Sequence, residues 1–429
     1  MRQYRIRGRT RIAGQIAVGG AKNAVLPILA AVCLNKGESV IHNCPRIDDT
    51  FLSIEILKHI GCRVEFTGNT LHVDASNISE INIPGEWVGK MRSSILFMGA
   101  MLGRVGQVNI AYPGGCGIGK RSIDFHIDGL KAMGAEITIE DEVLYCKGKL
   151  RGAVIHLESA SVGATENLML AGTLAKGTTI ITNAAKEPEV VDLAYFLNKM
   201  GASIHGAGTE KITIVEGAER LTSATHMVMP DRIVAGTYLT AAAMTAGKIN
   251  LTNVRPYDLV PTTSKLAMMG CEIRQSKDSI TLQGPRRLKA LSYLKTAEHP
   301  GFPTDMQAQF VAALSIADGY STVMESIFES RDAHAAGLNQ MGADIRTQSV
   351  PVNETSDKKA TLFEIMGQPA LIGSEVEAND LRGGAALVLA GIAAYGETVV
   401  KNAHYVERGY ECIERDLSGV GADIRLEVV

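Results

Sequence analysis

The chain has 429 residues, of which 46% are hydrophobic and 21% charged, and its formal net charge is −3. This length predicts two domains, and the composition is typical of a soluble globular protein. The small negative charge argues against a nucleic-acid-binding protein that relies on bulk positive charge, although local arginine clusters remain possible.

The seven cysteines are scattered along the chain and form no C-x-x-C pair. They therefore suggest neither a disulfide framework nor a zinc site, and a reducing cytosol suits them best. No apolar run reaches the about 18 residues that span a bilayer, and the basic start MRQYRIRGRTR lacks a following apolar signal segment. We expect a cytoplasmic protein without a metal, a cofactor or a membrane-inserted segment.

An apolar, alanine-rich segment recurs six times along the chain. Because each segment is apolar on nearly all sides, we expect a helix buried in a core rather than one lying on a surface. The six segments are residues 26–34, 95–102, 168–174, 238–244, 310–317 and 385–394.

Two glycine positions recur in register with these segments. One glycine opens a β-rich run after each apolar segment, at Gly37, Gly106, Gly177, Gly247, Gly319 and Gly396. The other is a natural C-terminal cap of a second, amphipathic helix, at Gly61, Gly134, Gly201, Gly270, Gly342 and Gly421. A shared period of roughly 70 residues defines an internal repeat that is too long for a solenoid unit. Six units in two domains predict an α/β fold with two clusters of three, strands outside and helices inside.

Charged residues keep the same register. Those just ahead of the apolar segments are Lys22, Arg92, Asp231, Arg232, Asp305, Asp380 and Arg382, and those after the first strands include Arg46, Asp49, Glu187, Glu189, Arg255, Asp258, Arg331 and Arg408. Equivalent loops of repeated units gather at one end of a domain, so these cations would converge beside helix N-termini, which favour anions. The alternative, a set of merely solvated loop charges, is disfavoured by their shared register.

The loop YPGGCGIGKR contains four glycines, the thiol of Cys116 and two cations. Glycines let the backbone approach a ligand closely, and Lys120 and Arg121 lower the pKa of a nearby thiol. One hypothesis is a catalytic lid whose thiol acts on an anionic substrate. Another is a phosphate loop of the form G-x-x-x-x-G-K, which fails at Arg121, where Ser or Thr should coordinate Mg²⁺. A glycine-rich turn with an inert cysteine is the third.

Several motifs together resemble one family over the chain from its first strand to its C-terminus: GGAKNAVLPIL, MRSSI, PGGCGIGKR, SVGATENLML, NAAKEPEVVDLA, MPDRIVAGTYL, HPGFPTDMQAQF, ESRDAH, NDLRGGAALVLAG and ERGYE. The chain is similar to the UDP-N-acetylglucosamine enolpyruvyl transferases. This resemblance implies a two-domain inside-out α/β barrel, shared with the 3-phosphoshikimate enolpyruvyl transferases. One domain would be residues 22–229 and the other residues 1–21 with 230–429, with the active site in the cleft between them.

The resemblance also implies a reaction. The family transfers the enolpyruvyl group of phosphoenolpyruvate to the 3′-hydroxyl of UDP-N-acetylglucosamine and releases phosphate through a tetrahedral intermediate, in the first committed step of peptidoglycan synthesis. Such chemistry needs an acid, a base and cations for the phosphate and carboxylate groups. Cys116 matches the proton donor to C3, which is also the thiol that fosfomycin alkylates, and Asp305 matches the base.

The remaining site residues follow from the same resemblance. Lys22, Arg121 and Arg408 would hold the phosphate, with Lys22 assisting as an acid. The others are Arg92, Arg331 and Arg382, which complete the anion cradle; Asn23 and Asp380, which orient the intermediate; and Glu187 and Glu189, which are carboxylates of the cleft.

The residues that match nucleotide contacts are Arg121, Ser122, Ile123, Asp124, Phe125, Ser161, Val162, Gly163, Asp305 and Ile327. The chain departs from the family pattern at Ser122, where proline is usual, and at Ser159, where a lysine often contacts the diphosphate. Both departures bear on nucleotide affinity more than on chemistry. His126 is interpreted as a polar surface residue or one that supports the site from behind, and residues 347–377 as a surface excursion.

Three alternatives remain at this point. The same chemistry could act on another nucleotide acceptor, as in an antibiotic pathway. A P-loop kinase or ATPase would need a Mg²⁺-binding hydroxyl after Lys120, which is absent. A non-enzymatic repeat scaffold would not require Cys116, Asp305 and the arginines to fall in equivalent loops, so an enzyme is favoured.

Overall fold

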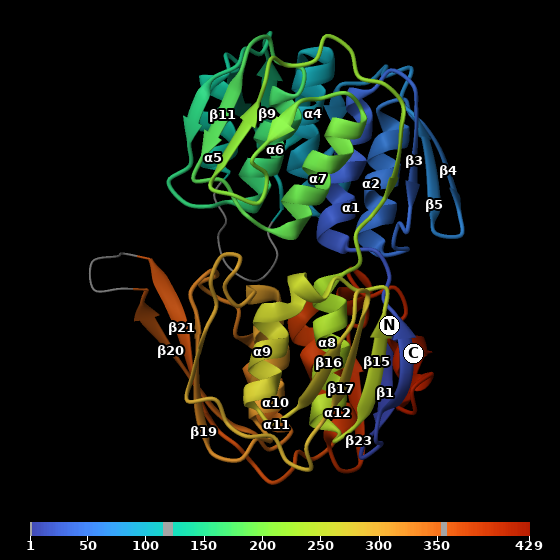
Figure 1. Ribbon diagram of the computed structural model, residues 1–429, viewed down its shortest axis with the longest axis vertical. Coiled ribbons are helices and arrows are strands. Elements are labelled where there is room, and N and C mark those ends of the chain that lie inside the picture. Colours follow the sequence, from blue (N-terminus) through green and yellow to red (C-terminus); the bar gives the residue numbers. More distant parts are fainter. Residues whose placement is uncertain (1, 115–122, 353–357) are drawn as a thin grey trace. The chain divides into compact units, whose positions relative to one another are not determined.

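The computed structural model describes residues 2–114, 123–352 and 358–429 (Figure 1). The described chain divides into two compact units. The central unit contains residues from 20 to 229, and the terminal unit contains residues 2–19 together with those from 230 to 429.

The central unit is built around three buried helices that pack against one another, α1 (Lys22–Ala31), α4 (Leu96–Val105) and α6 (Val162–Gly172). Its other helical segments are α2 (Asp48–His59), α3 (Gly85–Val88), α5 (Asp124–Ala132), α7 (Pro188–Lys199) and the 3₁₀ turns η1 (Val32–Leu34) and η2 (Arg92–Ile95). Helix α6 is buried from Ala164 to its end, including the polar residues Thr165, Glu166 and Asn167.

Three four-stranded sheets complete the central unit, in the strand orders β14-β3-β5-β4, β6-β7-β9-β8 and β10-β11-β13-β12. Their strands are β3 (Glu38–His42), β4 (Arg63–Thr67), β5 (Thr70–Asp74), β6 (Asn82–Ile83), β7 (Gln107–Ala111), β8 (Glu136–Glu140), β9 (Val143–Lys147), β10 (Val154–His156), β11 (Thr179–Thr182), β12 (Ile204–His205), β13 (Lys211–Ile214) and β14 (Ala224–Met227).

The terminal unit repeats this plan with buried helices α8 (Arg232–Met244), α10 (Gln307–Leu314) and α12 (Leu381–Ala393). Its other helical segments are α9 (Val260–Met268), α11 (Ala333–Gln340), α13 (His404–Glu407), α14 (Ile413–Ser418) and the 3₁₀ turns η3 (Pro256–Leu259) and η4 (Thr304–Met306).

The sheets of the terminal unit have the orders β16-β17-β15-β2, β18-β19-β21-β20 and β22-β23-β1-β24. Their strands are β1 (Arg2–Arg7), β2 (Ala13–Ala17), β15 (Lys248–Thr252), β16 (Glu272–Gln275), β17 (Ser279–Gln283), β18 (Tyr293–Lys295), β19 (Tyr320–Glu325), β20 (Asp344–Pro351), β21 (Lys359–Met366), β22 (Glu375–Glu377), β23 (Glu397–Lys401) and β24 (Asp423–Val428).

All six sheets share one topology. In each sheet the strand that follows the buried helix has two neighbours. On one side it pairs in parallel with an edge strand, and on the other side it pairs antiparallel with an inner strand. In four repeats the parallel partner is the strand that comes before the buried helix of the same repeat. The exceptions are β2, which pairs with β15, and β14, which pairs with β3. These two strands are exchanged between the first repeats of the two units, which places β2 in the terminal unit. The strand β1 belongs to the same unit because it pairs with β23 and β24.

These features confirm the expected inside-out α/β fold, with three repeats in each unit, helices inside and sheets outside (Figure 1). The expectation of a surface excursion over residues 347–377 was wrong for part of this range. Residues 347–351 and 359–366 are not a surface loop but continue the hairpin β20–β21, and Ala360, Phe363 and Ile365 of β21 are fully buried. A polar, exposed face on the edge strand β20 concealed the strand pattern. No helix in the described ranges is long and apolar enough to cross a membrane.

Candidate active site

Asp305 in the turn η4 of the terminal unit lies between two arginines. Arg331 Nη2 donates to Asp305 Oδ1 at 2.8 Å, and Arg382 Nη2 donates to Asp305 Oδ2 at 3.1 Å. The two arginine side chains are 6% and 1% exposed, whereas that of Asp305 is 21% exposed. The structure therefore brings together three of the predicted site residues, with the carboxylate nearest to solvent.

Arg382 is a buried cation in an acidic setting. Burial by itself lowers the pKa of a guanidinium, but the carboxylates of Asp305 and Asp231 and the hydroxyl of Tyr410 outweigh it and raise the pKa of Arg382 above its usual range. The guanidinium also lies 5.6 Å from the centroid of the Tyr410 ring. Arg382 is thus a permanently charged, fixed donor beside Asp305.

Three of the buried helices begin with a side-chain cap. Asp231 and Asp380 each accept two backbone N–H groups of the first turn, of α8 and α12 respectively, at 2.8 to 2.9 Å. Ser161 accepts one at the start of α6, at 3.3 Å. Caps of this kind satisfy donors that a helix leaves open at its start. Asp380, which we expected to orient an intermediate, therefore also fixes the first turn of the helix that carries Arg382.

Lys22 of the central unit forms a buried ion pair that the sequence did not indicate. Its Nζ lies 2.8 Å from Asp49 Oδ2, and the two side chains are 11% and 3% exposed. Lys22 and Asn23 are the first residues of α1, and Asp49 lies in the first turn of α2. In the sequence, the repeat register of Asp49 is the signal that indicates a position near Lys22.

His126 is buried, not at the surface, and lies beside predicted nucleotide contacts. Asn167 Oδ1 accepts the Gly99 N–H at 2.8 Å, so the Asn167 amide donates to His126 Nδ1 at 3.0 Å. Burial and the neighbouring Arg92 lower the pKa of His126 to about 3, so the ring is neutral with its proton on Nε2. A Cβ built on Gly163 would lie 3.4 Å from His126 Nε2, which places this ring edge against the first turn of α6.

Three carboxylates gather where α6 and α7 begin. Glu189 lies in the first turn of α7, and Glu187 is the residue that precedes this helix. Glu166 of α6, which sequence reasoning did not select, is buried, and burial together with Glu189 and Glu187 raises its pKa well above the usual value. Burial and the two neighbouring carboxylates thus favour the protonated form of Glu166.

The other predicted nucleotide residues of the central unit lie at two helix starts. Ile123 is buried just before α5, Asp124 is exposed and Phe125 half-buried in its first turn. Val162 and Gly163 are half-buried at the start of α6. Open backbone N–H groups at such positions suit phosphate groups.

The remaining predicted residues are either half-buried or lie outside the described ranges. Arg92 is half-buried in η2, and burial lowers its pKa. Ile327 and Arg408 are half-buried in the terminal unit, after β19 and α13 respectively. Cys116, Arg121 and Ser122 belong to residues 115–122, outside the part of the chain that the structure describes.

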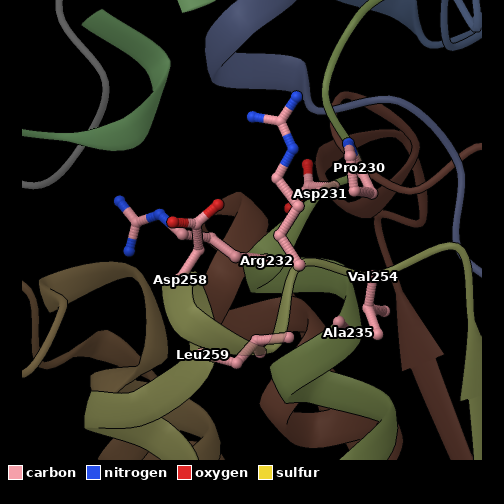
Figure 2. A pocket seen from close by; sticks show the side chains of 8 residues that line it. Pro230, Asp231, Arg232, Ala235, Val254, Asp258 and Leu259 are labelled. Carbon is pink, nitrogen blue, oxygen red and sulfur yellow. The ribbon is translucent and has the colours of Figure 1, made fainter. Parts of the chain in front are cut away.

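Figure 2 shows a pocket in the terminal unit at the start of α8, with Asp231 and Arg232 on one side and Asp258 of η3 on the other. None of the predicted substrate-binding residues lines this pocket. Among the described residues, no group of three or more His, Cys, Asp or Glu side chains could hold a metal ion.

Comparison with known proteins places these features in a family. The model of the family "EPSP synthase (3-phosphoshikimate 1-carboxyvinyltransferase)" matches residues 6–417. UDP-N-acetylglucosamine 1-carboxyvinyltransferase 2 of Caldanaerobacter subterraneus subsp. tengcongensis is 48% identical over 425 residues, which are 99% of each chain. UDP-N-acetylglucosamine 1-carboxyvinyltransferase 1 of Symbiobacterium thermophilum is 47% identical over 98% of this chain and 94% of that protein.

Solved structures show the same fold. The enolpyruvyl transferase NikO from Streptomyces tendae superposes with a TM-score of 0.86 at 25% identity, covering 100% of this chain and 99% of that one. EPSP synthase from Acinetobacter baumannii, with a TM-score of 0.74 at 19% identity, covers both chains fully and supports the fold alone. These matches favour an enzyme over the kinase and scaffold alternatives. The chain therefore belongs to the EPSP synthase family and is an enolpyruvyl transferase.

Proposed function

We propose that this enzyme transfers the enolpyruvyl group of phosphoenolpyruvate to the 3′-hydroxyl of UDP-N-acetylglucosamine and releases phosphate, a step of peptidoglycan synthesis. The two relatives at 47 and 48% identity carry the name of this activity, and their similarity extends over nearly the whole chain. The identities therefore favour UDP-N-acetylglucosamine over another nucleotide acceptor.

The observation that supports the chemistry most directly is the Asp305 carboxylate between Arg331 and Arg382. A carboxylate offers about four lone-pair sites, so two ion-paired oxygens still leave places for the hydroxyl proton of an acceptor. The Nε donors of Arg331 and Arg382 are buried and make no hydrogen bond within the described residues. A substrate carboxylate or phosphate would satisfy such donors, as a site for phosphoenolpyruvate requires.

In this proposal Cys116 gives a proton to C3 of phosphoenolpyruvate, and Asp305 takes the proton of the 3′-hydroxyl as its oxygen bonds to C2. The Cys116 thiolate then takes a proton back from C3 as phosphate leaves C2, and this elimination forms the carbon–carbon double bond of the enol ether product. The anions of substrate and intermediate would be held by Lys22, Arg92, Arg121, Arg331, Arg382 and Arg408. The other assigned residues are Asn23 and Asp380 at the intermediate, Glu187 and Glu189 as site carboxylates, and Ser122, Ile123, Asp124, Phe125, Ser161, Val162, Gly163 and Ile327 at the nucleotide.

Phosphate release from phosphoenolpyruvate tests this function. We expect release by the wild type only when UDP-N-acetylglucosamine is present. We expect it to be lost, by about 100-fold or more, in Cys116→Ala or after treatment with fosfomycin, because both remove the proton donor. Cys271→Ala is a matched control, because that thiol is buried in the core.

A different result would redirect the proposal. If UDP-N-acetylglucosamine elicits no release but phosphoenolpyruvate still protects Cys116 from alkylation, then the acceptor is wrong while the chemistry stands. Full activity of Cys116→Ala would show that another group donates the proton.

A further inference from the structure

One position of the repeat is an asparagine in four of the six repeats and a different residue in the other two. This position lies six residues after the opening glycine, and the four asparagines have φ between 52° and 59°. Asparagine is one of the few residues that readily adopt this left-handed conformation. Each of these side chains donates to a backbone carbonyl at 2.6 to 3.4 Å. The four are Asn43, Asn183, Asn253 and Asn402. The remaining repeats have Tyr112, ahead of the Cys116 loop, and Glu325, ahead of Arg331.

Glu325 is fully buried at the end of β19, and both of its carboxylate oxygens accept hydrogen bonds. Oε1 accepts from the backbone N–H groups of Ile327 at 2.8 Å and Phe328 at 3.1 Å, and from the Thr296 hydroxyl at 3.0 Å. Oε2 accepts from the Thr304 hydroxyl at 2.8 Å. A buried carboxylate is tolerated when hydrogen bonds replace its water, and this one has four. Glu325 thus ties together the ends of two strands and the turn before α10.

The hydrogen bonds of Glu325 form a network with two arms, one through Oε2 and one through Oε1. The arm through Oε2 leads to the predicted base, Asp305. Because the Thr304 hydroxyl donates a hydrogen bond to Glu325, its oxygen can only accept a further one, and Arg331 Nη1 donates to it at 2.7 Å. The other terminal nitrogen of Arg331 donates to Asp305 at 2.8 Å. The negative charge of Glu325 therefore sets the direction of the Thr304 hydroxyl, which in turn fixes the guanidinium that holds Asp305.

The other arm leads to the predicted nucleotide contact. Oε1 holds the backbone of Ile327 and Phe328, so the turn after β19 is fixed by the carboxylate rather than by a left-handed asparagine. We infer that Glu325 is a positioning residue for the transferase reaction, which orients Asp305 through Thr304 and Arg331 and fixes the Ile327 turn on its other side. This inference rests on the proposed function for the roles of Asp305 and Ile327.

Two sets of variants test the two arms. Glu325→Gln keeps the shape but turns one acceptor oxygen into a donor, which conflicts with the hydrogen bonds that the carboxylate accepts. We expect kcat to fall roughly 10- to 100-fold, the range for a lost hydrogen bond to a charged group, and KM for UDP-N-acetylglucosamine to rise. Thr304→Val cuts only the Asp305 arm, so kcat should fall by a similar factor while that KM changes by less than about twofold. Thr304→Ser, which keeps the hydroxyl, should recover most of the loss.

Asn253→Ala is the matched control, because it changes the same repeat position of the same unit without touching this network. It should lower the melting temperature but leave kcat unchanged. Equal losses of kcat in Asn253→Ala and Glu325→Gln, or equal activity of the Val and Ser variants of Thr304, would overturn the inference. If Glu325→Gln does not fold, the Thr304 pair still decides.

A crystal structure of Thr304→Val separates this inference from the proposed function. We expect Arg331 to move away from Asp305 in that structure whatever the acceptor substrate is. An unmoved Arg331 overturns the inference even if the wild type turns over UDP-N-acetylglucosamine. Conversely, a displaced Arg331 in an enzyme that does not use this nucleotide leaves the positioning network intact and rejects only the assigned substrate.

Discussion

Lys22 and Asp49 form an ion pair from two helix starts of the central unit, and the pair is almost fully buried. Removing one partner of a buried pair leaves the other charge without its counter-ion, at a penalty of about 3–5 kcal/mol. Because Lys22 is proposed to bind the phosphate of phosphoenolpyruvate, Asp49 would hold its ammonium in place.

We expect Asp49→Asn to lower kcat/KM for phosphoenolpyruvate by roughly 10- to 100-fold, together with the melting temperature, since a displaced cation loses a charge-assisted hydrogen bond to the substrate. Steady-state phosphate release measures the effect. Asp48→Asn, which removes the same charge one residue earlier, is the control and should behave like the wild type. Equal kinetics for the Asp49 variant and the wild type would show that Asp49 does not position Lys22 for phosphate binding.

At the scale of elements, α4 and α6 approach so closely that one glycine is required. A Cβ built on Gly99 would lie 2.3 Å from the carbonyl oxygen of Asn167, whereas one built on Gly103 of the same helix would meet nothing closer than 3.5 Å. The Gly99 N–H also donates to the Asn167 side chain, which in turn binds His126. Packing of the two helices and the state of the imidazole therefore depend on the same contact.

Gly99→Ala should lower the free energy of unfolding by about 1–3 kcal/mol, because the methyl group forces the helices apart. Gly103→Ala should be neutral or stabilising by about 0.5–1 kcal/mol, since alanine is the better helix former. Urea unfolding of both variants provides the comparison. If the two alanines had the same effect, the close approach at Gly99 would be of no consequence.

At the scale of the whole molecule, the central unit is continuous in sequence and the terminal unit is discontinuous, because the first two strands of the chain, β1 and β2, belong to sheets of the terminal unit. All strands of the central unit's sheets lie between residues 38 and 227. In the terminal unit, β1 lies between β23 and β24 and thus completes a sheet. The chain leaves and re-enters this unit at neighbouring points, because the Asp231 N–H donates to the Gly19 carbonyl at 2.9 Å.

We therefore expect residues 20–229 to fold as an isolated fragment, and residues 230–429 to remain unfolded when expressed alone. Fusing residues 1–19 directly or through a short linker to residue 230 should restore a cooperative unfolding transition, because it returns β1 and β2. Circular dichroism and thermal melting of the three fragments test this. A cooperative transition for residues 230–429 alone would contradict the role of the two N-terminal strands.

The sequence by itself determined the features that repeat locally: six apolar helices, their glycine marks and the register of Lys22, Asp305, Arg331 and Arg382. The helices follow from the apolar pattern within each segment, and the glycines and charges follow from the repeat of roughly 70 residues. Both patterns can be recognised without knowing any tertiary contact. Only the tertiary structure decided the exchange of β2 and β14, the pairing of Lys22 with Asp49, the burial of His126 and the four hydrogen bonds of Glu325. These depend on contacts between residues far apart in the chain, whose partners no local pattern specifies.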